Sequence, residues 1–123
     1  MDAGVFWELI ADICELGEFI ATTGTGGVSA NMVGKLQVGY DGSETVIQRT
    51  CCDDHIHCCP AQIASLKFGY CDIGYGMEPC VDLINERGQV CLKFYYRGSD
   101  AVHKYRKFVE RHRRHENLVD GEW

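Results

Sequence analysis

The amino-acid sequence predicts an α+β domain in which an antiparallel β-sheet is flanked by an N-terminal and a C-terminal helix. Apolar residues recur at helical spacing only near the two ends of the chain, and the part between them holds short β-branched and aromatic runs separated by glycine-containing turns. Because helices do not alternate with strands, the pattern favours an antiparallel sheet over a βαβ arrangement. A length of 123 residues suits one domain, so we expect residues 1–123 to fold as a single unit.

The first helix is expected over residues 4–16, where apolar residues from Phe6 to Leu16 recur every three or four positions. Asp2 precedes this run as an N-cap, and Gly17 follows it as a stop signal. A single apolar stripe predicts that the helix packs on one side against the sheet.

The last helix is expected to start at Ser99 or Asp100 and to become basic. Residues 100–116 carry six Lys or Arg and three Asp or Glu, a net +3, which leaves −9 for the rest of a chain whose total is −6. The acidic start and basic end suit the helix dipole. We expect a solvated helix face here, not a nucleic-acid interface, and a frayed tail over residues 117–123.

Between the helices, extended stretches predict the sheet. The clearest alternation runs from Val90 to Tyr96, where Val90, Leu92, Phe94 and Tyr96 share one face. Turn residues such as Asp41-Gly42 separate the stretches. The expected strands cover residues 18–23, 28–33, 36–40, 44–50, 62–71, 79–84 and 90–96.

The chain is expected to be cytoplasmic. It contains no run of eighteen or more apolar residues, so we expect no membrane span, and its start, MDAGVFWELI, is acidic where a secretory signal is basic. In a reducing compartment, its eight cysteines are expected to be free thiols or ligands rather than disulfides.

The candidate chemical centre is the stretch Thr50–Pro60, TCCDDHIHCCP, which holds four cysteines and two histidines. One interpretation is a site for a soft metal, zinc or copper, because thiolate and imidazole are ligands that these ions accept. In an extended run, however, neighbouring residues point to opposite faces, so one strand does not easily surround a tetrahedral ion. The candidate ligands are His57, His55, Cys52 and Cys58, with Cys59 as a substitute for Cys58.

A second interpretation, thiol catalysis, has less support. The chain contains no Cys-x-x-Cys motif, and a disulfide between adjacent cysteines is strained. A histidine beside a cysteine could activate a thiolate, but the stretch shows no third group that would orient the pair.

A third interpretation is a haem site. Histidine is a common axial ligand, and haem needs in addition an apolar slot and cations for its propionates. Phe68 and Phe94 could line the slot, and Arg97 or Lys93 could meet a propionate. Met77 is a further residue that could reach iron. These residues alone do not decide among the three interpretations.

The order of short motifs after Gly34 narrows the choice. A His-x-His element comes first, an Ile-Ala strand follows, and a glycine turn leads into a strand that carries lysine and phenylalanine. The stretches concerned are His55-Ile56-His57, Ile63-Ala64-Ser65-Leu66, Val81 to Gly88, Leu92-Lys93-Phe94-Tyr95, Arg97 and the helix from Asp100.

In this order of motifs the chain resembles the cytosolic haem-utilisation proteins of the HutX/ChuX and HemS kind, over about two-thirds of its length. It departs from them at Ile56, where the family usually has glycine, and at Leu92, where it has phenylalanine. The resemblance implies an antiparallel α+β fold of the HemS/ChuX kind, with haem as the cofactor and a homodimer as the assembly.

The resemblance also implies site residues. His57 is the first candidate for the axial ligand and His55 the next, with Arg97 and then Lys93 as candidates for the propionates. A single domain favours a carrier over a haem-degrading enzyme. We therefore expect an intracellular haem-binding protein that stores or transfers haem. The alternatives are a zinc or copper protein that uses the Cys/His stretch, and a structural or regulatory module whose haem site has decayed.

Overall fold

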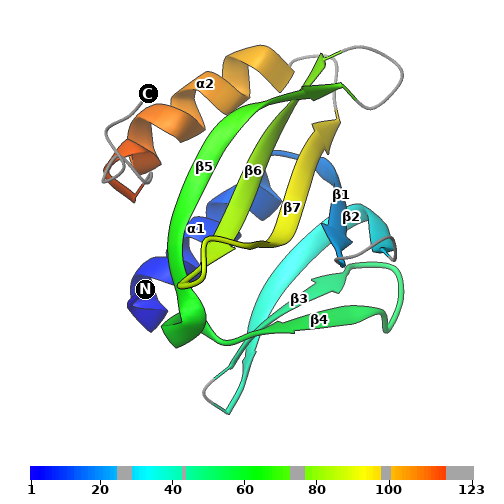
Figure 1. Ribbon diagram of the computed structural model, residues 1–123. Coiled ribbons are helices and arrows are strands. Elements are labelled where there is room, and N and C mark those ends of the chain that lie inside the picture. The colour runs from blue at the N-terminus through cyan, green and yellow to red at the C-terminus, as the bar shows by residue number, and fades with distance from the viewer. Residues whose placement is uncertain (25–28, 43, 73–76, 98–100, 116–123) are drawn as a thin grey trace.

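An antiparallel sheet carries both helices on one of its faces in the computed structural model, which describes residues 1–24, 29–42, 44–72, 77–97 and 101–115 (Figure 1). Its seven strands lie in the order β4-β3-β2-β1-β7-β6-β5. The predicted α+β fold class is thereby confirmed. The helices are α1 (Ala3–Glu15) and α2 (Ala101–His112), the 3-10 turns are Pro60–Gln62 and Arg113–His115, and the strands are β1 (Glu18–Thr23), β2 (Ala30–Asp41), β3 (Glu44–Arg49), β4 (His55–Cys58), β5 (Ile63–Asp72), β6 (Met77–Asn85) and β7 (Val90–Arg97).

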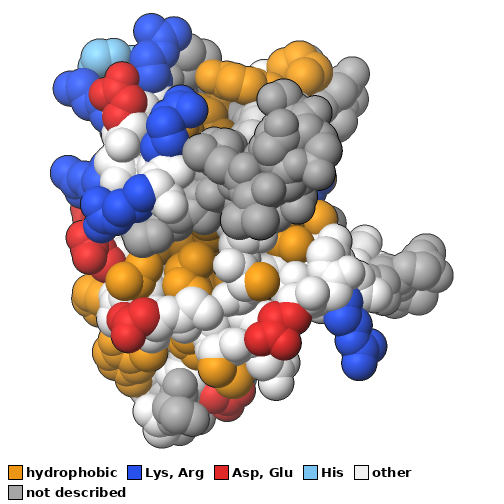
Figure 2. Space-filling model, turned by 60° about the vertical axis from the view of Figure 1, so that its left-hand side comes forward, with side chains coloured by type: hydrophobic (Ala, Val, Ile, Leu, Met, Phe, Trp, Pro, Cys, Tyr) orange, Lys and Arg blue, Asp and Glu red, His pale blue; other side chains and the backbone are white. Residues whose placement is uncertain are grey.

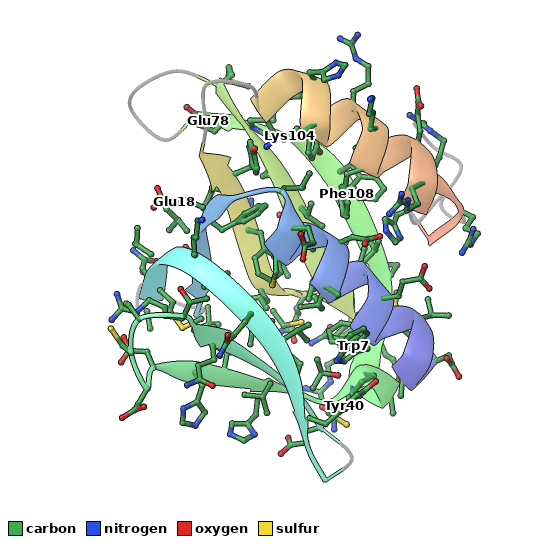
Figure 3. All side chains as sticks on the ribbon, turned by 180° about the vertical axis from the view of Figure 1, so that it is seen from behind. Trp7, Glu18, Tyr40, Glu78, Lys104 and Phe108 are labelled. Carbon is green, nitrogen blue, oxygen red and sulfur yellow. The ribbon has the colours of Figure 1, made fainter. Side chains whose placement is uncertain are left out.

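The prediction of two separate strands on either side of Gly34 is wrong, because one continuous strand, β2, runs through this residue. Gly34 has a φ of +135°, which only glycine adopts without strain, and the strand continues through it. From Ala30 to Lys35 β2 pairs with β1, and from Leu36 to Asp41 it pairs with β3. The strand therefore changes partner where it bends, and its arch is visible in Figure 3.

Helix α1 forms where it was predicted. Asp2 caps its N-terminal end and Tyr96 its C-terminal end. The carboxylate of Asp2 accepts hydrogen bonds from the N–H groups of Gly4 (3.0 Å) and Val5 (3.1 Å). At the other end the Tyr96 hydroxyl donates to the Leu16 carbonyl, one of the groups that a helix leaves unpaired. The apolar face of α1 then buries Phe6, Leu9, Ile10 and Ile13.

The core lies between the helices and the sheet face that they cover. Phe94 is fully buried there, and Phe19 packs edge-on against both Phe94 and Tyr96, with ring centroids 5.9 Å and 5.2 Å apart. The alternation of β7 produces this arrangement, because every second side chain points toward the helices.

Helix α2 covers β5 and β6 and is tied to them by Tyr105. The Gly69 N–H donates to the Tyr105 hydroxyl (2.9 Å), which in turn donates to the Cys80 carbonyl (2.8 Å). Lys and Arg side chains gather over the exposed side of α2 in Figure 2. The expected cap at Ser99 or Asp100 and the expected frayed tail lie outside the described residues. Within the described ranges, no helix has the length and apolar character needed to cross a membrane.

Candidate functional site

The two histidines of the Cys/His stretch lie side by side on the sheet face that the helices leave open. They belong to β4, which the sequence did not predict as a separate strand and which pairs with β3 as a hairpin. Since residues two apart in a strand share a face, His55 and His57 both point outward, and both are exposed. Their ring centroids are 4.9 Å apart, with the rings edge to face.

Each histidine has its Nδ1 atom beside an oxygen. The His57 Nδ1 lies 3.3 Å from Oε1 of Glu44, and the His55 Nδ1 lies 2.7 Å from the Asp53 carbonyl oxygen. Both oxygens are acceptors, so these contacts favour the tautomer with the proton on Nδ1. That tautomer leaves the Nε2 lone pair of each ring as the one that can bind a metal centre.

A hollow of about 300 Å³ adjoins the histidines on this open face. Strands β2, β3 and β4 all contribute to it, and Gly39 pairs with Val46 across its base. A Cβ atom added at Gly39 would meet no other atom within 4 Å, so the missing side chain is what keeps the hollow open there. The lining residues are Gln37, Val38, Gly39, Tyr40, Val46, Gln48, His55 and His57.

A helix side chain supports the rim of the hollow. Tyr40 stacks on Trp7 of α1, with ring centroids 5.9 Å apart and an interplanar angle of 14° (Figure 3). The open face of β2–β4 is thereby braced from the helix side, although Tyr40 itself is 59% exposed.

The two cationic candidates lie on β7, with β3, β2 and β1 between that strand and the histidines. Lys93 is on the open face, where its Nζ lies 3.4 Å from Oδ1 of Asp82 and 5.8 Å from the centroid of the Tyr95 ring. The backbone of Arg97 pairs with Glu18, while its side chain lies outside the part of the chain that the structure describes.

The aromatic candidates are not near the histidines, which corrects the expectation that Phe68 and Phe94 line a slot beside them. Phe94 is fully buried in the core, and Phe68 packs edge-on against Phe108 of α2 with centroids 5.7 Å apart. Both belong to the face that the helices cover, because the alternation of β5 and β7 sets them opposite to residues such as Lys93.

The candidate metal ligands do not converge either. Cys52 is exposed in the turn after β3, whereas Cys58 is buried on the face away from His55 and His57. Burial raises the pKa of Cys58 to about 12, so its thiol stays protonated at neutral pH. Across the described ranges, no group of three or more His, Cys, Asp or Glu side chains could hold a metal ion, which corrects the expected zinc or copper site.

Sequence reasoning missed Glu44 and Gly39, although both shape the site. Their positions follow from the pairing register of β3 with its two neighbours. In that register Tyr40 lies opposite Thr45 in β2–β3, and Thr45 lies opposite Cys58 in β3–β4. A hairpin assignment with the turn over residues 50–54 would have brought the end of β4 back beside Glu44.

Comparison with known proteins supports the fold. No family model and no curated protein sequence matches the chain. Among solved structures, the haem-binding protein ChuX has a TM-score of 0.71 at 12% identity, over 92% of this chain and 76% of ChuX. Holo-PhuS, a haem-binding protein from Pseudomonas aeruginosa, has a TM-score of 0.65 at 13% identity, over 85% of this chain and 32% of PhuS.

A third similar structure is ChuS, an E. coli haem oxygenase, with a TM-score of 0.64 at 15% identity, over 89% of this chain and 35% of ChuS. The chain therefore has the fold of these three proteins, as the resemblance implied.

Proposed function

We propose that this chain is a haem-binding protein that stores haem or transfers it in haem and iron utilisation, with His57 as the axial ligand. The observation that carries the proposal is the position of His57 on the open face, with its Nδ1 atom 3.3 Å from Glu44. Two structures of the same fold, ChuX and PhuS, are haem-binding proteins. The iron of haem accepts an imidazole as axial ligand, which is the chemistry that this histidine would serve.

The carboxylate partner distinguishes His57 from His55. A carboxylate beside Nδ1 fixes the tautomer and the ring orientation, and it makes the opposite nitrogen a more basic ligand. His55 has a backbone carbonyl as its partner, supplied by the turn and not by a strand. We therefore assign the role of axial ligand to His57 and a supporting role to His55.

The open face offers room for a flat ligand beside these rings. The hollow of about 300 Å³ has strand backbone at Gly39 where a larger side chain would obstruct it. Lys93 and Arg97 remain the proposed partners of the propionates. Lys93 would have to exchange its contact with Asp82, at 3.4 Å, for such a role.

The test is an optical titration of the reduced protein with haemin. The wild type is expected to give a saturable Soret shift, and His57→Ala is expected to lose it. Glu44→Gln is expected to weaken binding by about tenfold or more, since loss of a ligand's carboxylate partner typically has that effect. His103→Ala, an exposed histidine of α2, is the matched control and should bind as the wild type does.

Two results would contradict this proposal. One is a folded wild-type protein without a saturable shift, which would favour the structural or regulatory module instead. The other is a Soret shift that both His57→Ala and His55→Ala give with the affinity of the wild type. The axial ligand would then be a different residue.

We further propose that the protein is a carrier and not a haem-degrading enzyme, and that it forms a homodimer. Light scattering of the purified chain tests the assembly. Incubation of the haem complex with a reductant and oxygen tests the carrier role. If the protein is a carrier, the Soret band is expected to persist during this incubation.

A further inference from the structure

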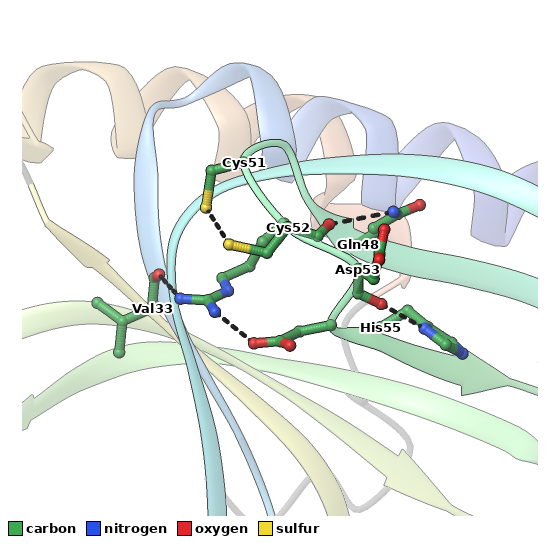
Figure 4. Close-up of polar contacts among 8 residues, drawn as sticks. Val33, Gln48, Cys51, Cys52, Asp53 and His55 are labelled. Carbon is green, nitrogen blue, oxygen red and sulfur yellow. Dashed lines mark hydrogen bonds and ion pairs between the residues drawn. The ribbon is translucent and has the colours of Figure 1, made fainter.

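The chain contains two pairs of adjacent cysteines, and the structure places them in opposite settings. Cys51 and Cys52 are both exposed in the turn between β3 and β4, and their Sγ atoms are 2.7 Å apart (Figure 4). Cys58 and Cys59 lie at the end of β4 in extended backbone, which points neighbouring side chains to opposite sides. The first pair brings two accessible sulfur atoms together, and the second pair separates them.

A cation lies beside the first pair and is held there. The Arg49 guanidinium forms an ion pair with Asp54 and donates a hydrogen bond to the Val33 carbonyl oxygen at 3.3 Å (Figure 4). A fixed positive charge next to a thiol favours its thiolate form, which is the form that reacts with disulfides.

The surroundings of Cys52 act on its pKa in both directions. Contact with the Cys51 thiol and then desolvation raise the pKa of Cys52, while Arg49 acts in the opposite direction. The two sulfur atoms therefore lie in hydrogen-bond contact, beside the charge of Arg49.

We propose that Cys51 and Cys52 form a reactive dithiol that low-molecular-weight disulfides, such as oxidised glutathione, convert to an intramolecular disulfide. The thiolate of one cysteine attacks the glutathione disulfide, whose S–S bond breaks and releases one glutathione. The neighbouring cysteine, as its thiolate, then attacks the mixed disulfide and releases the second glutathione. Two protein thiols lose two electrons and two protons, and one glutathione disulfide gains them.

The geometry suits this reaction and its reversal. A disulfide bond is about 2.05 Å long, so the two sulfur atoms need to approach by only ~0.7 Å. Ring closure between adjacent residues strains the peptide that joins them, and strained, exposed disulfides are the labile ones. The bond is thus expected to break again under a mild excess of reduced thiol.

The same turn holds two side chains of the open face, so its oxidation has a consequence for them. The Cys52 carbonyl accepts a hydrogen bond from Gln48 Nε2 at 3.2 Å, and the Asp53 carbonyl lies 2.7 Å from His55 Nδ1 (Figure 4). A twist of the Cys51–Cys52 peptide moves the carbonyl groups that these side chains contact. We therefore expect the His55 ring to respond to the oxidation state of the dithiol.

The first measurement is mass spectrometry of the full chain after exposure to oxidised glutathione. The expected product has lost two hydrogen atoms within the peptide that contains Cys51 and Cys52, with no stable adduct. Cys51→Ser and Cys52→Ser are each expected to retain one glutathione adduct, because no second thiol resolves it. Cys58→Ser, from the second pair, is the matched control and should give the wild-type product.

The proposal would be overturned by a wild-type protein that keeps a glutathione adduct on Cys51 or Cys52, or whose first disulfide joins other cysteines. The second measurement is the imidazole NMR spectrum, in which oxidation should shift the His55 signals and leave those of His103 unchanged. Unchanged His55 signals in the oxidised protein would refute the link to the open face. No haem is added, so either failure leaves the proposed function untouched.

Discussion

Among single residues, Gly39 has the clearest effect on what the open face can bind. It stands opposite Val46 in the β2–β3 ladder, at the base of the hollow beside His55 and His57. Its φ is not positive, so no backbone requirement selects glycine here. Glycine within a strand usually weakens it and often marks a place where another group approaches closely. We infer that Gly39 provides room for a ligand.

Gly39→Leu tests this inference. The added side chain would occupy the hollow, so haemin affinity is expected to fall by at least about tenfold, while stability changes by no more than about 1 kcal/mol. Gly69→Leu is the matched control, because Gly69 also lies in a strand and an added Cβ there also meets no atom within 4 Å. Affinity should be measured by optical titration and stability by urea unfolding. Equal affinity in the two variants would contradict the inferred role of Gly39.

At the scale of elements, the sequence predicted the strands and helices whose apolar periodicity is long. Strand β1 forms over residues 18–23 as expected, and β7 shows the expected alternation from Val90 to Tyr96. Strand β4 was not predicted as a separate strand, since four residues, His55–Cys58, carry too short a pattern. The single long β2 was missed because glycine commonly ends a strand. Here the strand continues through Gly34 because β2 pairs with β1 before the bend and with β3 after it.

The carboxylate of Asp12 joins the two helices through hydrogen bonds to two side chains of α2. His112 is 2% exposed, and its Nε2 lies 2.6 Å from Oδ2 of Asp12 on α1; Arg111 Nη1 lies 3.1 Å from the same oxygen. His112 follows Tyr105 and Phe108 at helical spacing, which puts it on the apolar side of the last helix, but the sequence does not identify a partner one hundred residues away. Only the packing of α2 against α1 brings the two side chains together.

His112→Ala is expected to lower the free energy of unfolding by about 2 to 3 kcal/mol, because it removes a charge-assisted hydrogen bond and leaves a cavity. His103→Ala is the matched control on the same helix. Its side chain is exposed, so the change should stay within about 0.5 kcal/mol. Urea unfolding followed by circular dichroism gives both values. If the two variants unfold at the same urea concentration, the pair does not stabilise the helix contact.

For the whole molecule, the division of the sheet into a covered and an open face decides which of the candidate site residues lie close together. The histidine pair was identifiable because two imidazoles at alternate positions share a face in any strand. The aromatic residues were misassigned because the same alternation does not tell which face the helices cover. Partners such as Glu44 depend on strand register, which short strands do not encode locally.

Two shielded thiols, the partly buried Cys14 and the buried Cys58, give the whole molecule a predicted sensitivity to alkaline pH. The pKa values of Cys14 and Cys58 are raised from an ordinary 9.0 to about 12, chiefly by burial and next by the charges of Glu15 and Cys91 respectively. Between these pH values the unfolded chain loses protons that the folded protein keeps. Stability is therefore fully present below pH 9 and declines as the pH rises toward 12.

Each of these two thiols is expected to contribute a decline of at most about 1.4 kcal/mol per pH unit within that window. Urea unfolding at a series of pH values above 9, with a phosphine reductant present, measures the slope. In Cys58→Ala, stability should decline less steeply with pH than in the wild type, by about the contribution of one thiol to the slope. This holds whatever the stability of the variant at neutral pH. Val81→Ala, which changes a buried side chain without an ionisable group, should follow the wild-type slope. If Cys58→Ala declines as steeply as the wild type, the buried thiol is not the source of the alkaline sensitivity.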